Sequence, residues 1–202
     1  MTSEVDIANA ALIKLGEPVV TAITGTGLNK PARTMGARYE PLRDHELRTH
    51  LWNFAAAEAK LAQLSAAPVI GYTYAYQLPT DFLRVAAVYS NAAGLGTIPY
   101  KIVGSTIQCD ASAVWLRYVR KVTVVNEMTP DFREVLSALL AADTAIAITQ
   151  SASLRDANFG LYNRLVGIAR STDAIEDWPE EIPPGSWITE RFRGSSGSSE
   201  LL

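Results

Sequence analysis

The chain has 202 residues, of which 48% are hydrophobic and 19% are charged, and its formal net charge is -3 at pH 7. This length and hydrophobic content allow one large core or two small ones, and they exclude a chain that is disordered throughout. The acidic balance argues against a protein that mainly grips nucleic-acid phosphates, and the single cysteine, Cys109, excludes an intrachain disulfide and a thiolate cage for a metal.

The first helix is expected near the start of the chain. Ser3 is a suitable N-cap, and Glu4 and Asp6 follow in the first turn, where the helix dipole favours acids. Gly16 followed by Pro18 ends the run. The apolar residues on its expected buried face are Val5, Ala8, Leu12 and Leu15. An acidic start with no long apolar run after it predicts neither a secretory signal nor a membrane span.

Residues 35–64 have the mixed apolar and charged texture of amphipathic helix, and the rest of the chain is expected to pack around them. The second helix should open near Pro31. A kink or break is expected at residues 37–41, because proline at position 41 removes a hydrogen bond and clashes one turn back. Trp52 and Phe54 bury a large area and predict the hinge where one helix hands over to the next.

The two histidines, His45 and His50, are one residue too far apart for the H-E-x-x-H arrangement of a metal site. On a helix this spacing turns the second ring roughly 140° away from the first, so a solvated or hydrogen-bonded pair is predicted. Four arginines recur at intervals that spread them around the helix, and we interpret them as ion-pair and interface residues. They are Arg33, Arg38, Arg43 and Arg48.

A small antiparallel sheet is predicted between the second and third helices. Tyr72, Tyr74 and Tyr76 alternate with small or polar residues, which is the period of a strand with its tyrosines on one side. Further short strands are expected at residues 83–89, 100–103, 106–109 and 114–119. Asp81 and Arg84 are the only charged residues between positions 61 and 100. Exposed sheets usually carry guarding charges, so either partners cover this sheet or the helices bury both of its faces.

Two further helices are expected after the sheet. Thr129-Pro130-Asp131 is a strong helix start, and the small residues around the third helix predict a central position in a bundle. Its expected buried stripe is Phe132, Val135, Leu136, Leu139, Leu140 and Ile146. The fourth helix should run over residues 153–171, with Leu154, Leu161, Leu165 and Ile168 on one face. Gly160 and Gly167 cost helix propensity, so close contact with a facing helix backbone is expected at both.

The C-terminal region changes character again. Its acids arrive without a basic residue before Arg191, and prolines at positions 179, 183 and 184 forbid a regular helix. Aromatic and aliphatic residues punctuate this segment, which predicts an extended arm that docks on its own subunit or on a partner. They are Trp178, Trp187, Ile188 and Phe192.

Motifs for catalysis or cofactor binding are not found in the sequence. Gly25-Thr26-Gly27 is too weak for a phosphate loop, and there is no G-x-S-x-G. Glu180-Glu181 are adjacent acids in a proline-rich tail, which makes them a poor general acid and base couple. We therefore expect a protein that is not an enzyme, with no catalytic residues, no cofactor and no metal.

Several stretches together resemble the tubular tail protein A family of short-tailed bacteriophages, the adaptor between the portal and the tail nozzle. The first stretch is Tyr39, Arg43-Asp44, Leu47-Arg48 and His50-Leu51-Trp52-Asn53-Phe54-Ala55, similar to the family run YxxxRDxxLRxHPWNFA. The second runs from Tyr74 to Val85, similar to YxYxLPxDxLRV. Residues 115–119, 130–132 and 162–169 continue the match in order. Leu51 stands where the family usually has proline, which puts the local geometry of the bend in doubt.

The resemblance implies a closed ring of subunits, commonly a dodecamer, in which helices form the wall of a DNA channel. It implies that the inserted β domain faces the tail through Tyr72, Tyr74 and Tyr76, and that the C-terminal arm binds the portal. The expected portal-binding residues are Trp187, Ile188, Arg191 and Phe192. DNA would pass through without specific binding, because a conduit must let phosphates slide.

We therefore expect an α+β fold: a helical bundle with an inserted small antiparallel β-sheet and an extended C-terminal arm. The helical bundle would comprise residues 1–66 and 128–172, the β domain residues 67–127, and the arm residues 173–202. The expected function is a structural head-to-tail adaptor of the virion neck, assembled in the host cytoplasm, with portal, tail nozzle and further copies as partners and no membrane. The alternatives are a head-completion or connector protein of a long-tailed phage or gene transfer agent, and a tail-associated peptidoglycan hydrolase.

Overall fold

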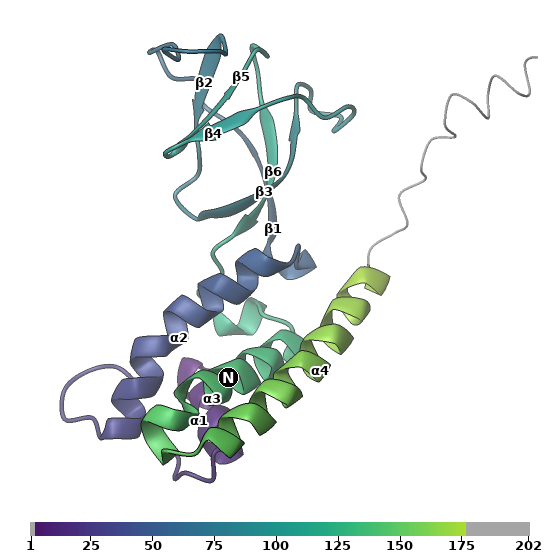
Figure 1. Cartoon of the computed structure of the whole chain (residues 1–202). Coiled ribbons are helices and arrows are strands. Elements are labelled where there is room, and N and C mark those ends of the chain that lie inside the picture. Colours follow the sequence, from purple (N-terminus) through teal and green to yellow (C-terminus); the bar gives the residue numbers. More distant parts are fainter. Residues whose placement is uncertain (1–2, 177–202) are drawn as a thin grey trace, which may run out of the picture.

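The computed structural model describes residues 3–176, which fold into a helical bundle with a β domain at one end (Figure 1). The helices are α1 (Glu4–Lys14), α2 (Lys30–Thr49), α3 (Pro130–Thr149) and α4 (Ala152–Glu176). The strands are β1 (Ala56–Lys60), β2 (Tyr74–Gln77), β3 (Phe82–Tyr89), β4 (Lys101–Val103), β5 (Thr106–Cys109) and β6 (Trp115–Arg120). Short 3-10 helices lie at Asn53–Ala55 and Val125–Glu127. The expected α+β class is confirmed, whereas most of the expected arm lies outside the described residues.

Side-chain caps begin three of the helices where the sequence predicts them. Ser3 and Asp6 form a reciprocal capping box at α1, with Asp6 Oδ2 accepting from the Ser3 amide at 2.7 Å. Asn29 accepts from the Ala32 amide at the start of α2, and Thr129 accepts from Phe132 at the start of α3. Each such cap contributes about 1 kcal/mol, so these helix starts are well determined locally.

Helix α3 is the central element of the bundle and packs against α1, α2 and α4. Most of its predicted stripe is buried, and four of its alanines are also buried, which brings the neighbouring helices close. These alanines are Ala138, Ala141, Ala142 and Ala145. The central position is confirmed, but Ile146 is 47% exposed and its assignment to the buried stripe is wrong.

Helix α2 runs without interruption through Pro41, so of the kink or break expected at residues 37–41 the break does not occur. The proline is on the exposed side of the helix, where water can satisfy the carbonyl that loses its intrahelical partner. The expected continuation as helix after Phe54 is also wrong, because Ala56–Lys60 form β1 and pair with β6. Alanine, glutamate and lysine favour helix, but here sheet pairing outweighs that preference. Strand structure thus begins before residue 67, and α4 continues past residue 172.

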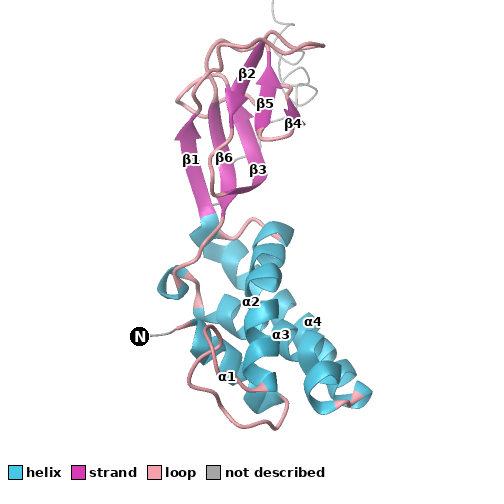
Figure 2. Cartoon of the chain, turned by 90° about the vertical axis from the view of Figure 1, so that its left-hand side faces the viewer, coloured by secondary structure: helices cyan, strands magenta, loops and turns pink. Residues whose placement is uncertain are grey.

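The β domain contains two three-stranded antiparallel sheets, where one small sheet was expected (Figure 2). The first, with order β1-β6-β3, lies next to the bundle and contacts α2; the second, with order β2-β5-β4, lies farther from the helices in both views. Their apolar faces share a separate core that includes Leu61, Tyr76, Ile107 and Leu116. The alternative in which helices bury both faces is therefore wrong, because the sheets cover each other.

The two glycines of α4 do not make the close contacts expected of them. Gly160 and Gly167 are both exposed, and a Cβ atom placed on either would meet nothing within 4 Å. Ile168, expected on the buried face, is 62% exposed. This side of α4 has no partner within residues 3–176.

Candidate functional site: the groove of the β domain and the apolar strand connections

The structure separates the three tyrosines that were expected to face the tail. Tyr76 is 1% exposed, and its hydroxyl donates to the Ala111 carbonyl at 2.6 Å, so its ring is core and its assignment to a contact surface is wrong. Burial raises the pKa of the Tyr76 hydroxyl. Tyr72 and Tyr74 are half-buried. The expected portal-binding residues Trp187, Ile188, Arg191 and Phe192 lie outside the described residues, as do Glu180 and Glu181.

The hinge, residues 50–55, joins the two halves of the molecule around one aromatic cluster. Trp52 is 1% exposed and packs edge-on against Phe132 of α3, with ring centroids 5.2 Å apart. Phe54 contacts Phe132 from another side at 5.0 Å. The Trp52 indole donates to the Glu46 carbonyl at 3.1 Å, which ties the hinge to the last turn of α2. The dense packing predicted at Trp52 and Phe54 is confirmed.

A buried carboxylate connects α2 to α4 beside this hinge. Glu46 is fully buried and accepts from the Tyr162 hydroxyl at 2.8 Å, while Arg170 lies 3.5 Å from its other oxygen. Arg170 also donates to Thr49 at 3.1 Å. Burial, followed by the hydrogen bond to Glu46, raises the pKa of Tyr162 to about 12. The surroundings therefore keep the phenol as a donor to the carboxylate.

Asp173 anchors the end of α4 to the hinge itself. Its carboxylate accepts from the Asn53 amide at 3.1 Å, and its carbonyl accepts from the Asn53 side chain at 2.7 Å. His50 Nε2 lies 3.2 Å from the same carboxylate. His45 is exposed on α2, so the two histidines do not converge, and His50 is hydrogen-bonded as the prediction allowed.

Two of the four helical arginines make the ion pairs expected of them. Arg38 contacts Asp143 at 2.6 Å, and the fully buried Arg43 contacts Asp44 at 2.9 Å. Lys121, after β6, reaches Asp44 from the other side at 2.9 Å. This pair of contacts joins α2 to the connection that returns from the β domain.

One face of the first sheet is not covered by the second sheet, and we call it the open face. Cross-strand partners share a face, so the register places three rows across it. The rows are Ala56, Val119 and Arg84; Glu58, Arg117 and Ala87; and Lys60, Trp115 and Tyr89. The neighbouring residues Ala57 and Ala59 pack toward the β-domain core instead. The alternation makes β1 exposed at every second position.

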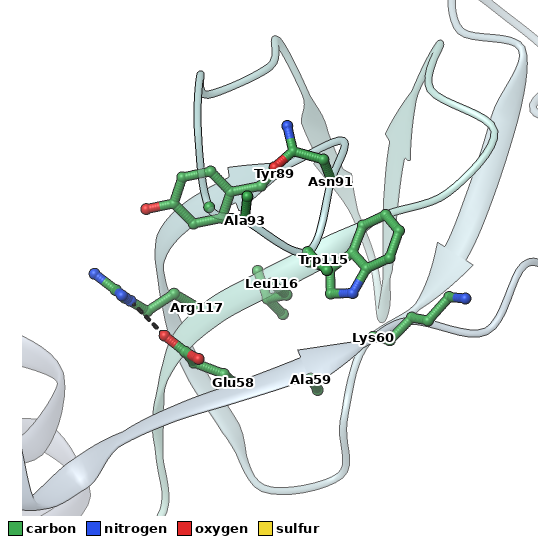
Figure 3. A pocket seen from close by; sticks show the side chains of 11 residues that line it. Glu58, Ala59, Lys60, Tyr89, Asn91, Ala93, Trp115, Leu116 and Arg117 are labelled. Carbon is green, nitrogen blue, oxygen red and sulfur yellow. Dashed lines mark hydrogen bonds and ion pairs between the residues drawn. The ribbon is translucent and has the colours of Figure 1, made fainter.

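Two neighbouring hollows lie along the open face, and we call the two together the groove. The upper hollow, of about 360 Å³, is lined by Tyr89, Trp115 and the loop at residues 91–94 (Figure 3). The lower one, of about 520 Å³, extends from the sheet to Leu51 and Glu176. Both are lined by Glu58 and Arg117, which form an ion pair at 2.9 Å, so the two hollows adjoin at this pair.

The groove combines aromatic surface with charged side chains of both signs. Lys60 Nζ lies 5.1 Å from the centroid of the Trp115 ring, a cation–π distance. Arg84 donates to the carbonyls of Arg48 and Thr49 at the end of α2, which holds its guanidinium at the hinge end of the face. The two hollows are lined by two cations, Lys60 and Arg117, and by two carboxylates, Glu58 and Glu176, so the aromatic surface beside Lys60 is the feature that favours a ligand.

Two strand connections of the β domain, between β1 and β2 and between β3 and β4, expose large aliphatic side chains. Val69 is 98% exposed, Ile70 84% and Leu95 71%. All three belong to the stretch between residues 61 and 100 whose only charges are Asp81 and Arg84. Large exposed aliphatic side chains without guarding charges are typical of a surface that a partner covers.

The chemistry of the described residues is that of ion pairs and packing. Within residues 3–176, no His, Cys, Asp or Glu side chains gather in a group that could hold a metal ion. Burial raises the pKa of the Cys109 thiol, which makes it a weak nucleophile. No helix in this part of the chain is both long and apolar enough to cross a membrane.

The sequence did not reveal the open face, because it depends on β1 and on the register of β3 with β6. The alternation of exposed Glu58 and Lys60 with alanines was the available signal, but it is short and rich in helix formers. A scan of the chain against protein-family models finds no match, and a search of curated proteins finds no significant relative.

Proposed function

We propose that this chain is a structural adaptor of a bacteriophage neck, which docks under the portal and joins it to the tail. The observation that carries the proposal is the division of the molecule into two ends with different surfaces. A helical bundle stands at one end, and strand connections that expose Val69, Ile70 and Leu95 belong to the β domain at the other (Figure 1). The runs from Tyr39 to Ala55 and from Tyr74 to Val85 resemble the tubular tail protein A family, and this resemblance supports an adaptor whose two ends meet different partners.

The locked hinge supports a load-transmitting role. Four residues contact Glu46 or Asp173 and hold α4 against α2 and the hinge, while Trp52 packs between α2 and α3. A joint between two assemblies must keep their relative orientation, and buried hydrogen-bonded networks resist bending better than exposed ion pairs. The bundle and the first sheet are therefore suited to act as one rigid unit.

In this proposal the apolar connections contact the tail nozzle, and the C-terminal arm contacts the portal through Trp187, Ile188, Arg191 and Phe192. Copies of the chain form a closed ring, with the unpartnered side of α4 available to a neighbouring copy. DNA passes through the ring without being held, which suits a net charge of -3.

The two alternative functions assign other partners or substrates to this chain. A connector of a long-tailed phage or gene transfer agent would use the same fold at another joint, and only the identity of its partners separates the two readings. A peptidoglycan hydrolase would need a buried acid pair with separated pKa values. Detectable cleavage of peptidoglycan that is lost on replacing Glu180 and Glu181 would favour the hydrolase over the adaptor.

The portal contact can be tested by deleting residues from Gly185 onward. The deletion should abolish co-sedimentation with the portal, and the far-UV circular dichroism spectrum should keep its helical signal because the described bundle and sheets end at Glu176. A matched control replaces Ser195, Ser196 and Ser198 with alanine and should bind the portal normally. Unchanged co-sedimentation of the deleted chain would refute the docking role of the arm.

A further inference from the structure

The groove on the open face ends where the described chain ends. Glu176, the last residue of α4, lines the lower hollow together with Leu51 and Ala56. Asp173 and Arg170 fasten this end of α4 to the hinge, so the chain leaves the helix at a defined point beside the groove. The described part of the chain therefore ends at the mouth of the groove.

The residues that follow match the groove in chemistry. Asp177, Glu180 and Glu181 are acidic, and Trp178 stands among them as the first aromatic residue after α4. Lys60 and Arg117 line the groove, where Arg117 pairs with Glu58, and Glu176 is a second carboxylate at its lower end. The aromatic rings of Tyr89 and Trp115 line the upper hollow (Figure 3). A tryptophan can pack on such an aromatic surface, and the acids that follow it can lie beside Lys60.

The length of the segment also fits. The open face extends along β1 from Ala56 to Lys60, a rise of roughly 13 Å at the usual spacing of a strand. Residues 177–181 in extended form cover roughly 16 Å. The acids at positions 180 and 181 can therefore reach Lys60, at the end of the face away from the hinge.

We infer that residues 177–181 bind in the groove of their own chain, with Trp178 in the lower hollow and the acids toward Lys60. Attachment at Glu176 gives the segment a high effective concentration at the groove, so modest contacts suffice. In this proposal the contact holds residues 177–181 on their own chain and leaves the residues from 182 onward to bind a partner. It goes beyond the adaptor role and does not depend on it.

Carbodiimide cross-linking of the full-length chain tests this contact directly, because the reagent joins a lysine amine only to a carboxylate that touches it. The chain has five lysines, Lys14, Lys30, Lys60, Lys101 and Lys121. Glu180 or Glu181 should be joined to Lys60, and Lys101 on β4, which is also exposed, is the internal control. An equal mixture of ¹⁴N and ¹⁵N chains should give cross-links within one isotope only.

A pair of arm variants completes the test. Trp178→Ala should lower the yield of the Lys60 cross-link roughly tenfold, the effect expected when an aromatic anchor is truncated, and Trp187→Ala should leave it unchanged. Absence of the Lys60 product, equal yields at Lys60 and Lys101, or an unchanged yield in Trp178→Ala would overturn the inference. Mixed-isotope products would also overturn it, because they would place the segment on a second copy.

Discussion

Replacing both glycines of α4 with alanine should stabilise the isolated chain. Glycine costs about 1 kcal/mol relative to alanine inside a helix, so the Gly160→Ala and Gly167→Ala double variant should gain about 2 kcal/mol of unfolding free energy. The gain is available because a Cβ atom at either position meets nothing within 4 Å. For a chain of this size, the gain should raise the Tm by roughly 4 to 8 °C.

Gly36 provides a matched control of opposite sign. It also lies inside a helix, α2, but a Cβ atom there would overlap the carbonyl oxygen of Ile23. Overpacking of this kind costs roughly 1–3 kcal/mol even after the neighbours shift, which exceeds the propensity gain at the upper end of that range. Because the overlapped atom belongs to the backbone, Gly36→Ala should lower the Tm.

Urea denaturation at low protein concentration, followed by circular dichroism, measures both effects on the monomer. A destabilised Gly160→Ala and Gly167→Ala variant under these conditions would refute the assignment of both glycines to open surface. Sedimentation velocity at high concentration then examines assembly. If the outer side of α4 contacts a neighbouring copy, leucine at the two positions should reduce oligomer formation while the monomer keeps its stability.

Three further predictions concern the hinge and the apolar surface. Trp52→Ala should cost roughly 3–5 kcal/mol in urea denaturation, because it empties a fully packed site; a loss below about 1 kcal/mol would contradict the hinge description. The pKa of Tyr162 is raised from 10 to about 12, so the folded state keeps a proton that the unfolded state releases between these values; stability should be full below pH 10 and fall as the pH approaches 12. Tyr162→Phe should remove this decline of stability at alkaline pH. It should also lower the free energy of unfolding by roughly 1–3 kcal/mol at pH 7, because the buried Glu46 loses a hydrogen-bond donor. An unaltered dependence of stability on pH would count against the assignment. Ile70→Asp should change stability by less than about 0.5 kcal/mol but weaken binding to the tail nozzle in a pull-down, and equal binding would remove this surface from the contact.

Local signals predicted most of the secondary structure. The helix start at Thr129-Pro130 depends on one cap and one proline, which act within a single turn. Five of the six strands follow from alternation and turn residues, and the structure places them close to the expected positions. Such features depend on neighbours in the chain, so they survive whatever the tertiary arrangement is.

The failures come from interactions between distant residues. Residues 56–60 favour helix locally but form β1 because β6 pairs with them. Glu46 and Tyr162 are 116 positions apart in the sequence, so no local pattern connects the two. The expected role of Gly160 assumed a facing helix, and only the packing of α4 on α3 shows that this glycine points away from it.

The groove required the same kind of information. Lys60, Trp115 and Tyr89 come from three strands, and only the register brings them into one row. The sequence did indicate the character of the other surface, because the run without charges around Val69 and Ile70 was visible directly. The lack of charge around Val69 and Ile70 thus indicated from the sequence alone that a partner covers this region. The groove could be located only once the pairing of the strands was known.

The central claim, that copies of this chain join portal to tail, is tested most directly by the mass of the purified protein with and without the portal protein of the same virus. Light scattering coupled to size exclusion should show a portal complex whose added mass is a whole multiple of the chain mass of 21.9 kDa and matches a closed ring. A chain that stays a monomer in the presence of the portal, at concentrations where the portal itself is assembled, would contradict the adaptor role.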